Sequence, residues 1–109
     1  MRRRLPVLLV LLGALSACGP VQSTAYLLDA DVALEAARTA NAEKYAPYEF
    51  TAARLYLHKA REEVGYSDYD VALDFAKKAS KYANEAKKRS LATVASEEAP
   101  PPSPPGASE

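Results

Sequence analysis

The sequence predicts an all-α protein: a three-helix antiparallel bundle followed by a disordered, proline-rich C-terminal tail. Between residues 24 and 95 the only helix-breaking residues are Pro47 and Gly65, and they divide this region into three segments. Within each segment, alanine and larger apolar residues recur at steps of three and four, which is the period of an amphipathic helix. We therefore expect helices over about 24–45, 47–64 and 68–95, forming one small domain over residues 24–95.

The first segment has an apolar face that predicts burial against another helix. Its apolar positions fall in steps of four, at Leu28, Val32, Ala36 and Ala40, with Ala33 and Ala37 beside them. Such spacing places side chains on one side of a helix. We expect this alanine-rich face to make close helix-to-helix contact.

Pro47 marks the start of the second helix. The residue before a proline is driven out of helical geometry, whereas proline itself is tolerated in a first helical turn. The buried stripe expected on this helix is Ala53, Tyr56, Leu57, Ala60 and Val64. Four residues fall largely off that stripe and are expected to be exposed to water: Arg54, His58, Arg61 and Glu62.

The third helix follows a turn at Gly65-Tyr66-Ser67-Asp68. We expect Gly65 to adopt the left-handed conformation that closes a helix, and Ser67 with Asp70 to form a variant capping box. The expected buried seam begins at Tyr69 and continues with small residues, namely Ala72, Ala76, Ala79, Ala83 and Ala86. The tail at 96–109 is rich in proline and is expected to be disordered, with extended polyproline geometry.

The first 17 residues have the three parts of a secretory signal peptide. Arg2, Arg3 and Arg4 precede an apolar run over residues 5–15, and small residues then lead to Cys18. The run is shorter than the roughly 20 residues that span a bilayer, which disfavours a retained membrane helix. Gly19-Pro20 is expected to break the helix, so that residues 18–23 form a short tether.

Leu15-Ser16-Ala17-Cys18 resembles the bacterial lipobox. The resemblance implies that the thiol of Cys18 receives a diacylglycerol, that cleavage removes residues 1–17, and that the new amine is acylated. Several acyl chains on one residue make membrane anchoring effectively permanent. Because Gly19 and not an aspartate follows the cysteine, the resemblance implies the periplasmic face of the outer membrane. The alternative is an ordinary signal peptide with a chance cysteine.

Composition argues against several classes of function. Without its three leading arginines the chain has eleven basic and fourteen acidic residues, a net charge of −3, which disfavours a nucleic-acid binder. His58 is the sole histidine and Cys18 the sole cysteine. A Cys-His pair or a histidine-rich metal site is therefore not available, and we expect no catalytic residues, cofactor or metal.

Two family resemblances cover the helical region. Asp68-Tyr69 followed by Ala72 and Ala79 resembles the turn and second helix of a tetratricopeptide unit, which implies a tetratricopeptide-like hairpin. A broader resemblance, to the lipoprotein domain of unknown function 4398, covers roughly residues 24–90 and rests on these segments: Ala46-Pro47-Tyr48-Glu49-Phe50-Thr51-Ala52-Ala53, Tyr56-Leu57, Tyr66-Ser67-Asp68-Tyr69 and Phe75-Ala76. That family implies an envelope location, and some similar chains carry an OmpA-like wall-binding domain.

These observations predict a lipid-anchored scaffold or protein-interaction module of the cell envelope. The implied partners are the membrane, through Cys18, and an envelope protein such as an OmpA-like one, or a second copy of the chain. The alternative is a structural lipoprotein that binds peptidoglycan directly through the basic end of the third helix. The candidate surface is Lys77, Lys78, Lys81, Lys87, Lys88 and Arg89.

Overall fold

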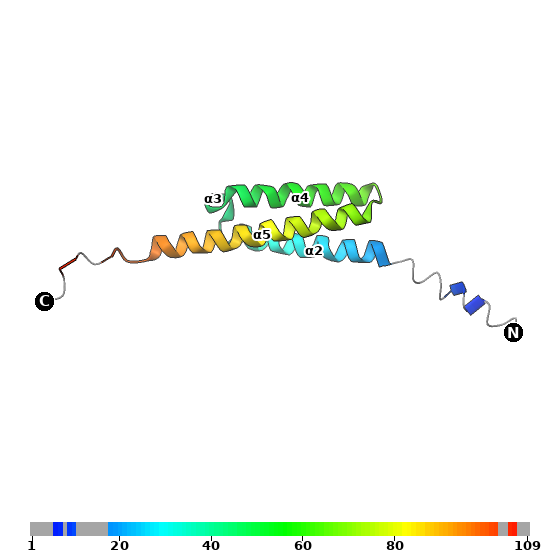
Figure 1. Cartoon of the computed structure of the whole chain (residues 1–109), viewed down its shortest axis with the longest axis horizontal. Coiled ribbons are helices and arrows are strands. Elements are labelled where there is room, and N and C mark those ends of the chain that lie inside the picture. The colour runs from blue at the N-terminus through cyan, green and yellow to red at the C-terminus, as the bar shows by residue number, and fades with distance from the viewer. Residues whose placement is uncertain (1–5, 8, 11–17, 103–104, 107–109) are drawn as a thin grey trace.

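The computed structural model describes residues 6–7, 9–10, 18–102 and 105–106, and within them the fold is all-α. The named elements of this described part are α2 (Cys18–Thr39), the short α3 (Ala42–Tyr45), α4 (Pro47–Gly65) and α5 (Tyr69–Glu98) (Figure 1). The all-α prediction is confirmed. Beyond Glu98, residues 99–102 are not helical.

Residues 18–23 belong to α2, so the expected helix break at Gly19-Pro20 is wrong. Gly19 and Pro20 lie in the first turn of α2 and do not break it. The first N–H groups of a helix have no intrahelical partner, so a proline there removes no hydrogen bond. Leu15, Ser16 and Ala17 lie outside the described residues.

The helix expected over 24–45 is wrong in its last turns. α2 ends at Thr39, and Asn41 adopts a left-handed conformation with φ 60° before α3 begins. Asparagine tolerates this conformation better than most residues. The reversal allows Ala42, Ala46 and Phe50 to gather with Ala37 around Ala86 of α5. The buried hydroxyl of Ser90 donates a hydrogen bond to the carbonyl of Ala40 and holds the turn against α5.

The turn between α4 and α5 forms, but with different residues from those expected. Gly65 is the last residue of α4, and it is Ser67 that has the positive φ, 63°. Asp68 is the N-cap of α5, because its carboxylate accepts a hydrogen bond from the Val71 N–H at 3.3 Å. The expected Ser67 capping box is therefore replaced by an aspartate cap one residue later.

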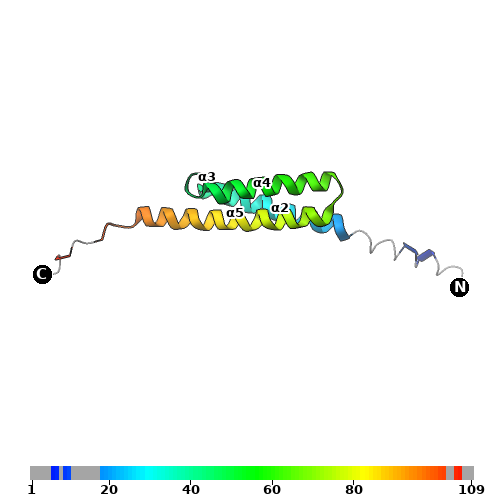
Figure 2. The same ribbon diagram turned by 45° about the horizontal axis from the view of Figure 1, so that its top comes forward.

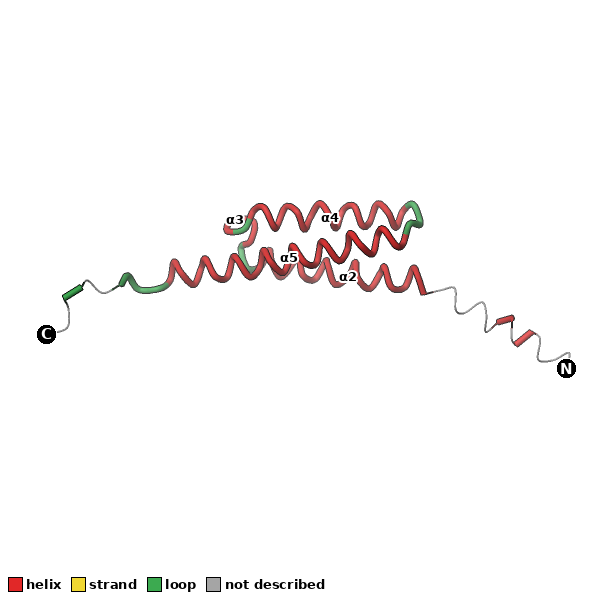
Figure 3. The backbone as a smooth tube through the Cα atoms, in the orientation of Figure 1, coloured by secondary structure: helices red, strands yellow, loops and turns green. Residues whose placement is uncertain are grey.

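α5 is the element on which the others pack. α2 and α4 both contact α5 extensively, whereas they contact each other much less. α2 and α5 run in the same direction and α4 runs back between the loops at its two ends (Figures 1 and 3). The turned view shows α4 and α2 along α5 and the last turns of α5 extending beyond them (Figure 2).

The core consists mainly of alanine, as the sequence predicted for α5. Every alanine of its expected seam is buried: Ala72, Ala76, Ala79, Ala83 and Ala86. On α4, Ala53, Leu57 and Ala60 are buried, and Tyr56 and Val64 are partly buried. The face predicted for α2 is only partly right. Ala37 is buried as expected, but Leu28 and Val32 are both 63% exposed, and the helix also buries Ala30, which was not expected.

Overpacking the α5 seam tests this core. Ala83 is fully buried, and the leucine in Ala83→Leu has no space without displacing a neighbouring helix. We expect a loss of about 1–3 kcal/mol in unfolding free energy, measured by urea denaturation. The control, Lys81→Leu, lies at an exposed position of the same helix and should change stability by less than about 0.5 kcal/mol. An unchanged urea midpoint in Ala83→Leu would show that this seam is not packed.

Candidate functional site

A groove of about 470 Å³ lies between α2 and α4. It exists because both helices pack on α5 but only sparsely on each other. Its floor is apolar, with Leu34 of α2 and Leu57 of α4, and most of its other lining residues are polar or charged. The full lining is Asp31, Leu34, Glu35, Arg38, Thr51, Arg54, Leu55, Leu57, His58 and Arg61.

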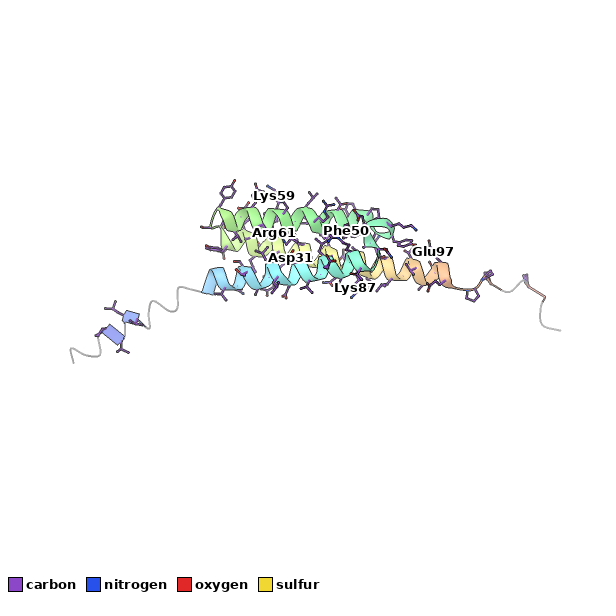
Figure 4. The ribbon with its side chains drawn as sticks, turned by 180° about the vertical axis from the view of Figure 1, so that it is seen from behind. Asp31, Phe50, Lys59, Arg61, Lys87 and Glu97 are labelled. Carbon is purple, nitrogen blue, oxygen red and sulfur yellow. The ribbon has the colours of Figure 1, made fainter. Side chains whose placement is uncertain are left out.

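Some charged side chains of the groove form ion pairs, whereas others form none among the described residues. Arg61 of α4 forms an ion pair with Asp31 across the groove, and the two side chains point toward one another in Figure 4. Arg38 bonds Glu35 on its own helix at 2.8 Å. Arg54 has no ion pair within the described part of the chain and remains available to an incoming anion.

Three basic residues of α4 lie on one side of the helix. Arg54, His58 and Arg61 are spaced by four and three residues, which places them on the same side of the helix. Arginine is well suited to bind carboxylates, because its planar group offers two parallel donors. The groove can therefore hold an acidic group over an apolar floor.

The sequence correctly predicted that Arg54, His58 and Arg61 are exposed, whereas Glu62, expected to be exposed with them, is partly buried. The sequence did not identify the groove. The row of three basic residues was visible in the spacing, whereas the opposite wall on α2 was not. Asp31 and Arg38 of α2 line the groove together with α4. This orientation of α2 depends on how α2 packs against α5, which the spacing alone does not give.

The basic residues predicted as an interaction surface on α5 do not form one uniform patch. Lys77, Lys81 and Lys88 are exposed and share one side of the helix, since they are four and seven residues apart. Lys87 precedes Lys88 by one residue and points in a different direction. Lys77 also lies 5.2 Å from the centre of the Tyr26 ring.

The other two basic residues of this set are engaged with α4. Lys78 lies 5.7 Å from the ring centre of Tyr56 and 5.5 Å from that of Phe75. Arg89 bonds the carboxylate of Glu49 at 3.0 Å, and the Glu49 side chain is only 9% exposed. Arg89 therefore neutralises a nearly buried charge, which is a structural role.

Aromatic rings line the seam between α4 and α5. The Tyr56 ring stacks on Phe75 and on Tyr82, with ring centres 6.0 Å and 5.5 Å apart. Tyr82 and Tyr48 meet edge to face, with ring centres 6.4 Å apart. The pKa of the Tyr82 phenol is raised mainly by two effects. The larger is repulsion from the charge that Tyr48 carries when ionised, and the smaller is the loss of hydration of the Tyr82 phenolate. Tyr48, Tyr56 and Tyr82 thus pack along the hairpin formed by α4 and α5.

Among the described residues, no group of three or more His, Cys, Asp or Glu side chains is placed to hold a metal ion. The same residues include no helix that is both long enough and apolar enough to cross a bilayer. Cys18, the predicted lipidation residue, is the first residue of α2.

Residues 25–100 match the family described as Domain of unknown function (DUF4398). The chain belongs to this family, as the sequence resemblance predicted. No curated protein and no solved structure matches the chain.

Proposed function

We propose that the protein is a lipid-anchored interaction module of the cell envelope, at the periplasmic face of the outer membrane. The observation that carries the proposal is Leu15-Ser16-Ala17-Cys18, which follows a basic and apolar leader. The family match begins at residue 25, so the helical domain follows the proposed anchor closely. A partner bound by this domain would therefore be held near the membrane.

The proposed interaction element is the α2–α4 groove, and the proposed partner is an acidic segment of an envelope protein. Arg54 supports this choice, because it faces the groove without an ion pair in the described part of the chain. Leu55, which is 61% exposed at the same groove, adds an apolar contact for the partner. Charged and apolar groups side by side favour a peptide over a free inorganic anion.

In this proposal α2, α4 and α5 act as a three-helix antiparallel bundle, with α4 and α5 as a tetratricopeptide-like hairpin. The opposite directions of α4 and α5 and the small-residue seam of α5 support that interpretation. The rigid alanine core then serves to hold the two walls of the groove apart.

A second candidate function is direct binding of peptidoglycan through α5. It is favoured by Lys77, Lys81 and Lys88, which are exposed on one side of that helix. This surface is smaller than the sequence predicted, because Lys78 and Arg89 are engaged with α4.

Site-specific photocrosslinking in the native envelope tests the groove. A benzoylphenylalanine at position 55 lies at the groove, and one at position 81 lies on α5. We expect a protein adduct from position 55 that is lost when Arg54→Glu is added. The matched control Lys59→Glu changes an exposed α4 residue that does not line the groove, and should leave the adduct intact.

The other outcomes separate the two candidates. Wall fragments attached at position 81, with nothing at position 55, would favour peptidoglycan binding by α5. A protein adduct at position 55 that persists in Arg54→Glu would contradict a charge-dependent groove. No adduct at either position would reject both surfaces.

A further inference from the structure

α2 carries an exposed apolar stripe that the fold leaves uncovered. Val21 is 70% exposed, and Leu28 and Val32 are each 63% exposed. Ala25, between them, is exposed as well. The opposite side of the same helix buries Ala30 and Ala37, so the stripe points away from the core. Large aliphatic side chains gathered on one helix face are a typical sign of an interaction surface.

The spacing of the stripe is that of a coiled-coil seam. Val21, Ala25, Leu28 and Val32 are separated by four, three and four residues, which assigns them to heptad positions d, a, d and a. Leucine at d together with valine at a favours two parallel strands. We propose that two copies of this chain pair side by side, in the same direction, through this α2 seam.

The charges beside the seam are compatible with parallel pairing. In a parallel pair, a residue at position g lies near the partner residue five positions further along, at position e. Asp31 then meets Ala36, and Asp29 meets Thr24, so no acidic residue faces another. Asp31 is in addition neutralised by Arg61 of its own chain.

The seam ends at Glu35, which occupies the next d position. Two glutamates would meet there, and like charges at a seam position oppose pairing. The contact is therefore limited to residues 21–32 of α2. A seam of this length is short for a coiled coil, so we expect a weak dimer that forms best where the chains are concentrated.

A second copy fits this face better than a lipid surface does. Asp29 and Asp31 flank the stripe, and anionic headgroups repel such residues. In the parallel arrangement each seam residue lies opposite its own counterpart, so the same apolar surface on both copies forms a two-fold symmetric contact. The pairing does not require lipidation. Two chains anchored at Cys18 would, however, start α2 at the same membrane surface, which suits a parallel pair.

Cysteine crosslinking of the full chain in the envelope tests the pairing. Val21→Cys and Leu28→Cys each place a thiol at a d position, and Lys81→Cys places one on exposed α5. With a short bismaleimide, we expect dimers from both seam variants and none from Lys81→Cys. Adding Val32→Glu to Leu28→Cys should abolish the dimer, whereas adding Lys59→Glu should not.

Two results would overturn the proposal. Dimers absent from both seam variants would exclude the seam, and a dimer from only one of them would exclude parallel pairing, because antiparallel helices cannot align both residues with their own counterparts. The unaltered chain shows whether the native Cys18 thiol reacts with the crosslinker. If the unaltered chain forms crosslinked dimers, the seam variants are tested again in a chain that also carries Cys18→Ser.

Discussion

Cys18→Ser is expected to abolish both lipidation and cleavage, so that the full-length precursor accumulates. The thiol is the only group in the chain that can form the thioether to diacylglycerol, because the sequence contains no other cysteine. Serine matches the size of cysteine but does not supply a thiolate nucleophile. Metabolic labelling with a tagged fatty acid and the mass of the purified protein measure the two effects directly.

The control for this experiment is Ser16→Ala, which preserves a small residue before the cysteine and should mature normally. Normal cleavage of the Cys18→Ser chain would show that residues 1–17 are an ordinary signal peptide and that the cysteine is incidental. Acyl label on the cleaved native chain, absent from Cys18→Ser, would support the anchor. The number of acyl chains follows from the mass, and two or more are required for stable anchoring.

The alanine seam of α5 shows how much of the fold is encoded locally. Ala72, Ala76, Ala79, Ala83 and Ala86 are the dominant apolar residues on one side of that helix, so their spacing predicts the buried face correctly. The same holds for Ala53, Leu57 and Ala60 on α4. Where a helix has a single apolar stripe, periodicity is sufficient.

α2 shows where local information fails. It carries two apolar stripes, one with Leu28 and Val32 and another with Ala30 and Ala37. Periodicity favours the larger side chains, but the close packing on α5 selects the smaller ones. For the same reason the groove could not be predicted, because the stripe of α2 that packs on α5 determines which residues of α2 face α4. Of this site, only the row of Arg54, His58 and Arg61 on α4 could be found from sequence.

The end of α2 before the left-handed Asn41 could not be predicted from the sequence pattern either. Nothing in the apolar spacing marks the end of α2, because alanines continue on both sides of Asn41. The helix ends where the chain must reverse to place Ala42 and Ala46 against Ala86. A tertiary contact therefore overrides a continuous helical pattern.

Phe50→Ala is expected to cause the largest loss of stability among single core substitutions. Phe50 is only 2% exposed, and the partly buried Leu34 packs against its cluster. Phe50 is the one large side chain among the buried residues of that cluster, the others being Ala37, Ala42, Ala46 and Ala86. Removing a buried phenylalanine costs about 3–5 kcal/mol, because apolar contact is lost and a cavity remains. Alanine neighbours have no side-chain freedom with which to fill that space. At roughly 0.05–0.15 kcal/mol per residue for a folded domain, this loss brings a chain of this size close to unfolding.

Circular dichroism during thermal and urea unfolding measures the effect of Phe50→Ala, with Leu55→Ala as the control on the same helix. Leu55 is 61% exposed and its truncation should cost less than about 0.5 kcal/mol. If Phe50→Ala does not fold at all, Phe50→Leu provides a graded measurement, since it retains most of the buried apolar volume and should cost less than the alanine substitution. Equal midpoints for Phe50→Leu, Leu55→Ala and the unaltered chain would contradict the central role of Phe50. A graded loss would instead show that one aromatic ring joins the α2–α3 reversal, α4 and α5, and so holds the walls of the groove in place.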